Sequence, residues 1–271
     1  MTSGIHPATP TSSRAVARAL TAALGAGPVS SLVMAHERLL PVPAAIAPLF
    51  GIDDHERPDH DPPALVRGHT IACSGSAAMS CALALVGSVT RAGSWAAIVG
   101  LPSVGVGAAG EMGVALERTV FVADPRRSGP TGEPADVIAA LIDGVEMVVL
   151  APALVSAVGA AAMRRLQTRA HTKGVLLVIV GPHPTASVDL HFDARVTRWE
   201  GLGRGHGHLQ RRRVEIALDG RRRARTTRLE VWLPDAHGRI TRVESAPDSV
   251  SGSVSVSGSV PGVVVPFRRA G

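Results

Sequence analysis

Between residues 65 and 200, short apolar runs alternate with longer stretches in which small and apolar residues recur at helical spacing. The runs predict strands at 69–73, 95–100, 119–123, 145–151 and 175–181. The longer stretches predict helices at 76–91, 105–116, 133–143 and 153–172. Runs such as VLLVIV at 175–180 are apolar on both faces, which is typical of parallel strands covered by helices on both sides. The sequence therefore predicts an α/β fold with a mostly parallel sheet over residues 65–200.

After residue 200 the apolar residues alternate with charged ones. RRRVEIAL at 211–218 and RLEVWLP at 228–234 both show this period of two, and an Asp-Gly pair begins the segment between them. The pattern predicts a C-terminal antiparallel β-hairpin with one charged face, within residues 201–244. Residues 245–271 are rich in Ser, Val and Gly and low in complexity, so we expect a disordered tail.

The first 64 residues form a separate N-terminal region. A serine cap at Ser12 or Ser13 predicts a helix that ends near Leu24 at a glycine pair. A second helical pattern runs from about Ser30 to Leu40. Residues 41–64 are rich in proline, histidine and acidic residues, and they predict a loop.

The composition narrows the range of functions. Of the 271 residues 45% are hydrophobic and 18% are charged, which is enough apolar material for a buried core. Only 3% are aromatic and none is tyrosine, which argues against an aromatic platform for single-stranded nucleic acid. Lys173 is the only lysine, so any mechanism that needs a lysine must use this residue.

The net charge of +6 arises in one C-terminal segment, because residues 204–228 contain nine arginines and two acidic residues. This asymmetry favours an acidic partner. With so few aromatic residues, any DNA contact would be salt-sensitive and independent of sequence. Three interpretations stay open, namely docking to a partner protein, non-specific DNA binding and a merely solvated face. The candidate contact residues are Arg204, Arg211, Arg212, Arg213, Arg221, Arg222, Arg223 and Arg225.

Cysteine use and hydropathy favour a cytoplasmic protein. Cys73 and Cys81 lie in apolar sequence, which indicates reduced, buried thiols. The N-terminus lacks the layout of a signal peptide. The uncharged stretches 71–90 and 147–163 approach the length of a membrane span, but glycine, proline and small polar residues interrupt them, so we expect no membrane association.

A strand, a Gly/Ser loop and a helix at 70–91 have the layout of a phosphate-binding loop. Such a loop needs glycines where the backbone approaches the phosphates, a lysine for the β- and γ-phosphates and a Ser/Thr hydroxyl for Mg²⁺. Aligned on G-x-x-x-x-G-K-[ST], CSGSAAMS places Cys73 and Ala78 at the glycine positions and Met79 at the lysine. Ser80 alone fits the pattern.

The two acidic residues that nucleotide hydrolysis also needs are absent from the expected positions. Leu150 stands near the end of the strand that should carry the Mg²⁺-binding acid, and Pro102 follows the strand that should precede the carboxylate for the attacking water. The joint loss predicts that ATP hydrolysis has been lost. The alternative is that the chain never had a nucleotide-binding fold.

Two other chemistries receive less support. His55 with His60, and His206 with His208, suggest zinc, but neither pair has a cysteine nearby, so we expect no metal. Ser74 and Ser76 beside Gly75 suggest a hydrolase nucleophile, yet the G-x-S-x-G pattern is absent and the sequence places no base beside them.

Four runs together resemble a RecA-type core whose catalytic residues have been replaced: RGHTIACSGSAAMSCALAL, GSWAAIVGLPSVGVGAAGEMGVALER, GVEMVVLAP and GVLLVIVG. The flanking ERLLPVPAAIAPLF and RWEGLGRGHGHLQRRRVEIALDGRRR make the chain similar to the actinobacterial ImuA-prime proteins, which are RecA-like accessory factors of an inducible mutasome. The tail at 245–271 lies outside the resemblance.

The resemblance implies a RecA-like fold and a non-catalytic adaptor in DNA-damage-induced translesion synthesis. Its partner would be ImuB, an inactive polymerase homologue that serves an error-prone polymerase, and self-association is expected as well. No cofactor is expected, and the chain would lie in the cytoplasm, at the nucleoid after DNA damage. The alternatives are a SulA-like cell-division inhibitor, a divergent RecA-type ATPase that uses Lys173, and a sequence-blind DNA-binding protein.

Overall fold

The computed structural model describes residues 39–51, 64–127, 133–182, 186–202, 207–221 and 223–243. The strands of its core are β3 (Thr70–Ser74), β4 (Ala96–Val99), β5 (Thr119–Val122), β6 (Met147–Leu150), β7 (Leu176–Val180) and β8 (Leu190–Leu202). They are followed by β9 (Gly207–Gly220), β10 (Thr227–Trp232) and β11 (Thr241–Arg242). The helices are α3 (Ala78–Arg91), α4 (Val106–Glu111), α5 (Pro134–Gly144) and α6 (Pro152–Lys173), with 3₁₀ turns at Leu116–Arg118 and Pro125–Arg127.

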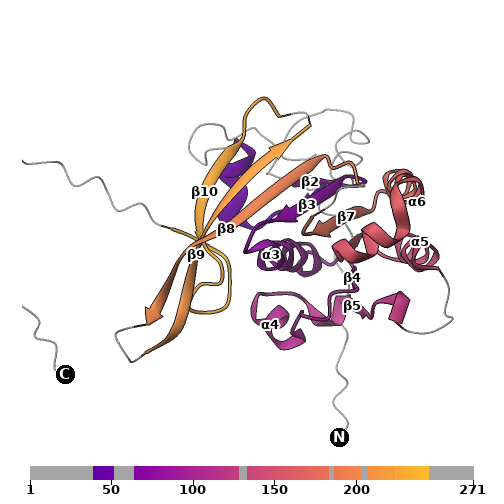
Figure 1. Ribbon diagram of the computed structural model, residues 1–271. Helices are drawn as coiled ribbons and strands as arrows, with labels where there is room; N and C mark the ends of the chain where they lie inside the picture. Colours follow the sequence, from indigo (N-terminus) through magenta and orange to yellow (C-terminus); the bar gives the residue numbers. More distant parts are fainter. Residues whose placement is uncertain are drawn as a thin grey trace, which may run out of the picture.

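These strands form one sheet of nine, in the order β11-β10-β9-β8-β3-β7-β6-β4-β5 (Figure 1). The strands from β8 to β5 pair in parallel, whereas β9, β10 and β11 pair antiparallel. The predicted α/β fold, with a large sheet flanked by helices and a C-terminal antiparallel hairpin, is confirmed at this level.

Helices cover both faces of the parallel part, with α3 on one side and α5 and α6 on the other (Figure 1). Alternate residues of β6 show the two layers: Met147 and Val149 pack with α3, whereas Val148 and Leu150 pack with α5 and α6. Such burial on both faces explains why these strands read as continuous apolar runs.

The predicted strands and helices of the core all occur, with one clear error in length. The helix predicted at 105–116 ends at Glu111, because Met112 and the left-handed Gly113, at φ +87°, close it. The stretches 71–90 and 147–163 form strand–helix units. Within the described residues, no helix is long and apolar enough to cross a membrane.

Two predictions for the N-terminal region are wrong where the structure describes it. Leu39 and Leu40 do not end a helix but lie in β1 (Leu39–Pro41), where Leu40 pairs with Leu65 of β2 (Ala64–Val66). The segment after Pro43 is not a loop but a 3₁₀ helix, η1 (Ala44–Phe50), whose Ile46 and Leu49 are buried in the core. The predicted helix at 12–24, most of the one at 30–40 and the tail at 245–271 lie outside the described residues.

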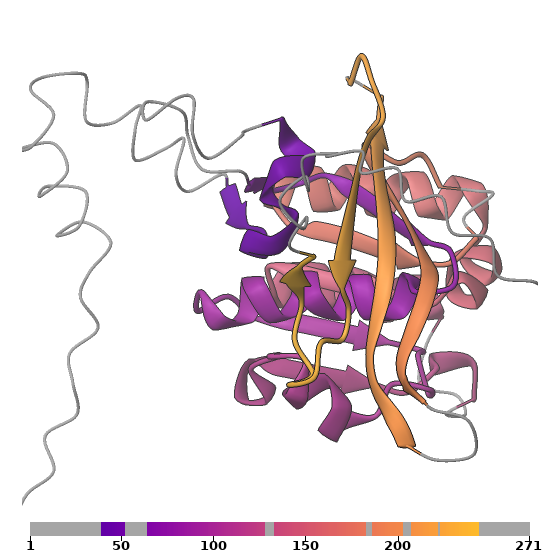
Figure 2. The same cartoon turned by 90° about the vertical axis from the view of Figure 1, so that its left-hand side faces the viewer.

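No strand was predicted at 190–202, yet β8 lies there and joins the parallel core to the hairpin. It pairs in parallel with β3 on one side and antiparallel with β9 on the other. Figure 2 shows β8 and β9 as long, twisted neighbours that extend beyond the helices. The hairpin therefore continues the central sheet, and the two share the core around Phe192 and Ile216.

Candidate functional site

The loop that resembles a phosphate-binding loop connects β3 to α3 and is fixed against β8. Gly75 has φ +87°, and a Cβ atom there would lie 2.3 Å from the Ala194 carbonyl oxygen, so only glycine fits. The Ala77 amide donates a hydrogen bond to that same oxygen at 2.9 Å. The Val196 amide donates to Ser76 Oγ, also at 2.9 Å. The loop is therefore held in one shape by its own sheet.

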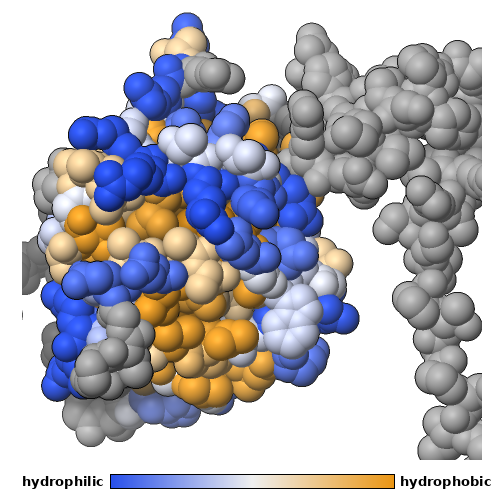
Figure 3. All heavy atoms as spheres, turned by 90° about the vertical axis from the view of Figure 1, so that its right-hand side faces the viewer, coloured by the Kyte–Doolittle hydropathy of each residue, from blue (hydrophilic) through white to orange (hydrophobic). Residues whose placement is uncertain are grey.

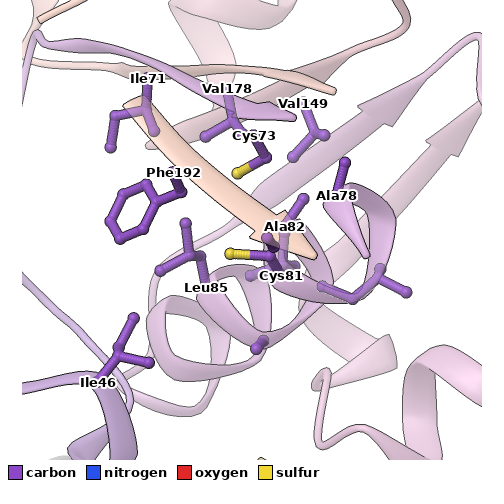
Figure 4. Close-up of a cluster of buried hydrophobic side chains, with 14 of the residues drawn as sticks. Ile46, Ile71, Cys73, Ala78, Cys81, Ala82, Leu85, Val149, Val178 and Phe192 are labelled. Atoms are coloured by element: carbon purple, nitrogen blue, oxygen red, sulfur yellow. The ribbon is translucent and has the colours of Figure 1, made fainter. Parts of the chain in front are cut away.

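The two positions that should carry glycine belong to the hydrophobic core. Cys73 is fully buried, and Ala78 is buried beside it in the same cluster as Cys81 and Leu85 (Figure 4). A hydrogen bond with Cys81, together with burial, raises the pKa of the Cys73 thiol well above its usual value. Cys73 therefore stays a neutral thiol, and its side chain fills space.

Met79 and Ser80 stand where a phosphate-binding loop has its lysine and its Mg²⁺-binding hydroxyl. Both residues make contacts within the chain instead. Met79 is partly buried and packs against the core. Ser80 Oγ accepts a hydrogen bond of 2.6 Å from the Arg212 guanidinium. Arg212 also donates to the Leu233 carbonyl at 2.7 Å and lies 5.2 Å from the Trp199 ring. Partial burial lowers the pKa of Arg212 from its very high ordinary value, so the group that holds Ser80 is still a cation at neutral pH.

Leu150 and Pro102, which stand where nucleotide hydrolysis would need acidic residues, do not come together at this loop. Leu150 is fully buried against α5 and α6. Pro102 is exposed and lines a groove of about 770 Å³ at the carboxyl ends of β4 and β5. Lys173 ends α6, just before β7 begins, and lies 3.6 Å from Asp143. Because β7 and β3 are parallel, Lys173 is at the edge of the sheet opposite to the loop.

The arginines that the sequence groups together are separated by the structure. Arg211 and Arg213 stack on Trp232 and pair with Glu200 and Glu230, whereas Arg212 points to the other face of β9. Arg221 lies ten residues further along, about 33 Å away at the usual rise of a strand.

The remaining candidate arginines have different environments. Arg223 donates to the Leu49 carbonyl and covers the Phe50 ring, which is a structural role. Arg225 is exposed, and it has no hydrogen bond or ion pair within the described part of the chain. Arg204 and Arg222 lie outside the described residues. The candidates therefore do not form one continuous basic patch.

A polar cluster that sequence reasoning missed lies at the end of β3, on the face opposite to Cys73. Ser74 Oγ is 2.7 Å from His191 Nε2, and His191 Nδ1 is 3.5 Å from Asp219 Oδ2. Asp193 lies 3.4 Å from Ser74 Oγ and forms an ion pair of 2.7 Å with Arg195. Ser74 was noticed in the sequence, but its partners are on β8 and β9, and β8 was not predicted.

The two histidine pairs, for which no metal is expected, lie mostly outside the described residues. His55, His60 and His206 lie outside the described residues. Among the residues that the structure describes, no group of three or more His, Cys, Asp or Glu side chains could hold an ion.

Apolar side chains are exposed along β5, the last strand of the sheet. Val120 and Phe121 are 40% and 36% exposed, and no strand pairs with the outer edge of β5 within the described residues. Phe121 also lines the groove that contains Pro102. Figure 3 shows a broad apolar area on the side of the molecule that carries α5, α6 and the β5 edge.

The chain is similar to a family model and to a mycobacterial protein. The family model described as the MT3502 N-terminal domain matches residues 61–185. A protein of Mycobacterium tuberculosis (strain ATCC 25618 / H37Rv), named "Uncharacterized protein Rv3395c", is 36% identical over 159 residues. That match covers 55% of this chain and 72% of the mycobacterial protein.

Proposed function

This chain belongs to the family of the mycobacterial protein and of the MT3502 N-terminal domain, and on that premise we propose that it is a RecA-like adaptor of the ImuA-prime type. The adaptor takes part in DNA-damage-induced translesion synthesis and does not hydrolyse ATP. It binds an ImuB-like polymerase homologue and thereby raises the local concentration of an error-prone polymerase at the lesion. A relative from an actinobacterium is consistent with this assignment.

The observation that carries the proposal is the state of the loop after β3. Cys73, Ala78 and Met79 pack in or against the core, and Arg212 already binds the Ser80 hydroxyl. A triphosphate needs backbone amides, a cation and Mg²⁺ at this place. Lys173 does not supply the cation, because it is at the opposite edge of the sheet beside Asp143. A strand–loop–helix with these residues supports a scaffold rather than an ATPase.

Two surfaces are available for protein contacts. Along the outer edge of β5, next to the exposed Phe121, no strand of the described residues pairs with the backbone, which suits self-association of sheets edge to edge. The hairpin region 201–234 offers Arg211 and Arg213 on its outer face, which suits an acidic partner surface. We assign the first surface to self-association and the second to the ImuB-like partner.

The experiment measures both contacts in parallel. Phe121→Asp lowers self-association in sedimentation velocity and leaves capture of the ImuB-like protein intact, whereas Arg211→Glu combined with Arg213→Glu abolishes capture. Val66→Asp and Arg165→Glu are the matched controls, since Val66 is 38% exposed on β2 and Arg165 is exposed on α6, and both lie outside the two surfaces. Arg212 is left unchanged, because its contacts to Ser80 and Leu233 hold the fold.

Three results would contradict the adaptor. Micromolar binding of ATP and Mg²⁺ by calorimetry, lost in Lys173→Ala, would favour a divergent ATPase. Cell filamentation on overexpression, without a defect in damage-induced mutagenesis on deletion, would favour a cell-division inhibitor. A gel shift that weakens steeply with salt, together with failure to capture the partner, would favour a DNA-binding protein.

A further inference from the structure

Three neighbouring strands place a serine, a histidine and an aspartate in a row on one face of the sheet. In the register of the strands, His191 of β8 lies between Ala72 of β3 and Asp219 of β9. Ser74 is two residues further along β3 than Ala72, so it points to the same face. This face is the one that α6 covers further along the sheet, where Gln167 donates to Thr70 Oγ1.

The contacts within the row are those of an activated nucleophile. His191 uses its two ring nitrogens for different partners, with Nε2 at 2.7 Å from Ser74 Oγ and Nδ1 at 3.5 Å from Asp219 Oδ2. A carboxylate beside Nδ1 favours the tautomer in which Nδ1 carries the hydrogen, and in this tautomer Nε2 is unprotonated and can accept a proton from Ser74 Oγ. A hydroxyl, a base within hydrogen-bond distance and a third group that orients the base are the parts that covalent catalysis requires.

The backbone around Ser74 adds a sharp turn. Ser74 is the last residue of a buried parallel strand, Gly75 follows in a left-handed conformation and α3 begins three residues later. A nucleophile at such a strand-to-helix turn is exposed at the carboxyl edge of the sheet, and the amide after it can bind an oxyanion. Within the described part of the chain, the Gly75 amide has no hydrogen-bond partner.

We propose that Ser74, His191 and Asp219 form a serine esterase site, with Ser74 as nucleophile, His191 as general base and Asp219 as positioning residue. As Ser74 Oγ attacks the ester carbonyl carbon, its proton moves to His191 Nε2. The imidazolium then gives this proton to the leaving alkoxide as the C–O bond breaks. Water attacks the acyl-serine in the same way, so that a carboxylic acid is released and Ser74 regains its proton. The inference goes beyond the adaptor role and does not rest on it.

The surroundings of Ser74 suit a carboxylic ester with a short acyl group. Asp193 accepts a second, longer hydrogen bond of 3.4 Å from Ser74 Oγ, and the ion pair with Arg195 balances the charge of Asp193. The groove at the ends of β4 and β5 is lined largely by apolar side chains, but Ser74 is not among its lining residues, so this groove cannot hold the acyl chain of an ester bound at Ser74. A short acyl group, free or at the end of a larger molecule, can reach the site from the open polar face.

The test uses the full-length chain, p-nitrophenyl acetate as substrate and a fluorophosphonate as covalent probe. The native chain gives one adduct, on the peptide that contains Ser74, and hydrolyses the ester. Ser74→Ala loses both, and His191→Gln lowers the rate about 100-fold, since glutamine keeps a hydrogen bond but cannot take the proton. Ser76→Ala is the matched control: Ser76 is two residues away, its hydroxyl binds the Val196 amide, and the variant keeps the native rate.

Asp219→Asn separates positioning from a structural role. It lowers kcat about tenfold with KM unchanged, because the wrong tautomer of His191 becomes accessible, and Asp219→Glu restores most of the rate. Thermal unfolding confirms that each variant is folded. A native chain that forms no adduct at Ser74, or that hydrolyses the ester no faster than folded Ser74→Ala, overturns the proposal. Capture of the ImuB-like partner by Ser74→Ala tests the adaptor role separately, so the two can fail independently.

Discussion

Cys73 and Ser74 are adjacent residues of β3, and they lie in opposite environments. Cys73 points toward α3, where its hydrogen bond with Cys81, together with burial in the core, raises the pKa of the thiol and keeps it neutral. Ser74 points to the other face, where its hydroxyl meets His191 and Asp193 near solvent. The pleat of one strand therefore divides the loop region into a sealed apolar face and an open polar face.

The two faces of β3 therefore differ in the chemistry that their side chains can perform. On the α3 face, Cys73, Ala78 and Met79 pack in or against the core, and Arg212 donates a hydrogen bond to the Ser80 hydroxyl. On the other face, β8 and β9 bring groups that can exchange protons to the end of β3. The two faces therefore have separate sets of neighbours, because adjacent residues of a strand point to opposite sides of the sheet.

The largest expected effect comes from Gly75→Ala, which disturbs the loop after β3 and thereby the contacts on both faces of the strand. The new Cβ atom would lie 2.3 Å from the Ala194 carbonyl oxygen, at a φ of +87° that alanine rarely adopts. We expect a loss of about 3 kcal/mol in the free energy of unfolding, from backbone strain and steric overlap together. Urea denaturation measures it.

Gly93→Ala is the matched control for this prediction. Gly93 also has a positive φ, +98°, but no atom lies within 4 Å of its added Cβ, so only the conformational cost of about 1 kcal/mol remains. Equal losses in the two variants would mean that the close approach of the loop to β8 does not hold the loop in place.

The second prediction places a hydroxyl on the buried face, with Cys73→Ser, and a thiol on the polar face, with Ser74→Cys. Cys73→Ser puts a hydroxyl into the apolar core, where the Cys81 sulfur is only a weak hydrogen-bond partner, and costs about 2 kcal/mol in urea denaturation. The raised pKa of Cys73 keeps it a thiol as the pH rises through 8, and both native cysteines are buried, so iodoacetamide leaves the folded chain unmodified. Ser74→Cys stays stable and is alkylated rapidly. If Cys73 in the native chain is alkylated as fast as the new cysteine in Ser74→Cys, the α3 face of β3 is not closed to solvent.

The core could be predicted from the sequence because burial on both faces leaves a local signature. Runs such as MVVL in β6 and LLVIV in β7 carry it, and their positions were correct to within two residues. β8 lacks the signature, since its outer positions are polar and its pairing partners are far apart in the chain. The apolar spacing also predicted too long a helix at α4, because Gly113 follows Met112 and ends the helix early.

The site was less predictable than the fold for a geometric reason. Ser74 and His191 are 117 residues apart, and they meet only because β8 inserts beside β3. The sequence groups three consecutive arginines, but the strand turns them to alternate faces. Arg212 binds Ser80, whereas Arg211 and Arg213 cover Trp232. Closeness in sequence therefore suggested an arginine cluster that the fold divides, and distance in sequence hid the contact between Ser74 and His191.

The smallest effect tests whether Arg212 belongs to the sealed face. Arg212→Ala removes the hydrogen bonds to Ser80 Oγ and to the Leu233 carbonyl, and we expect a loss of about 1.5 kcal/mol in urea denaturation. Arg225→Ala removes the same charge from an exposed position and changes the free energy of unfolding by less than about 0.5 kcal/mol. If the two losses are equal, Arg212 acts only as a surface charge. If Arg212→Ala instead gains affinity for ATP and Mg²⁺ in calorimetry, the guanidinium blocks a usable site, and the α3 face is a closed nucleotide pocket rather than core.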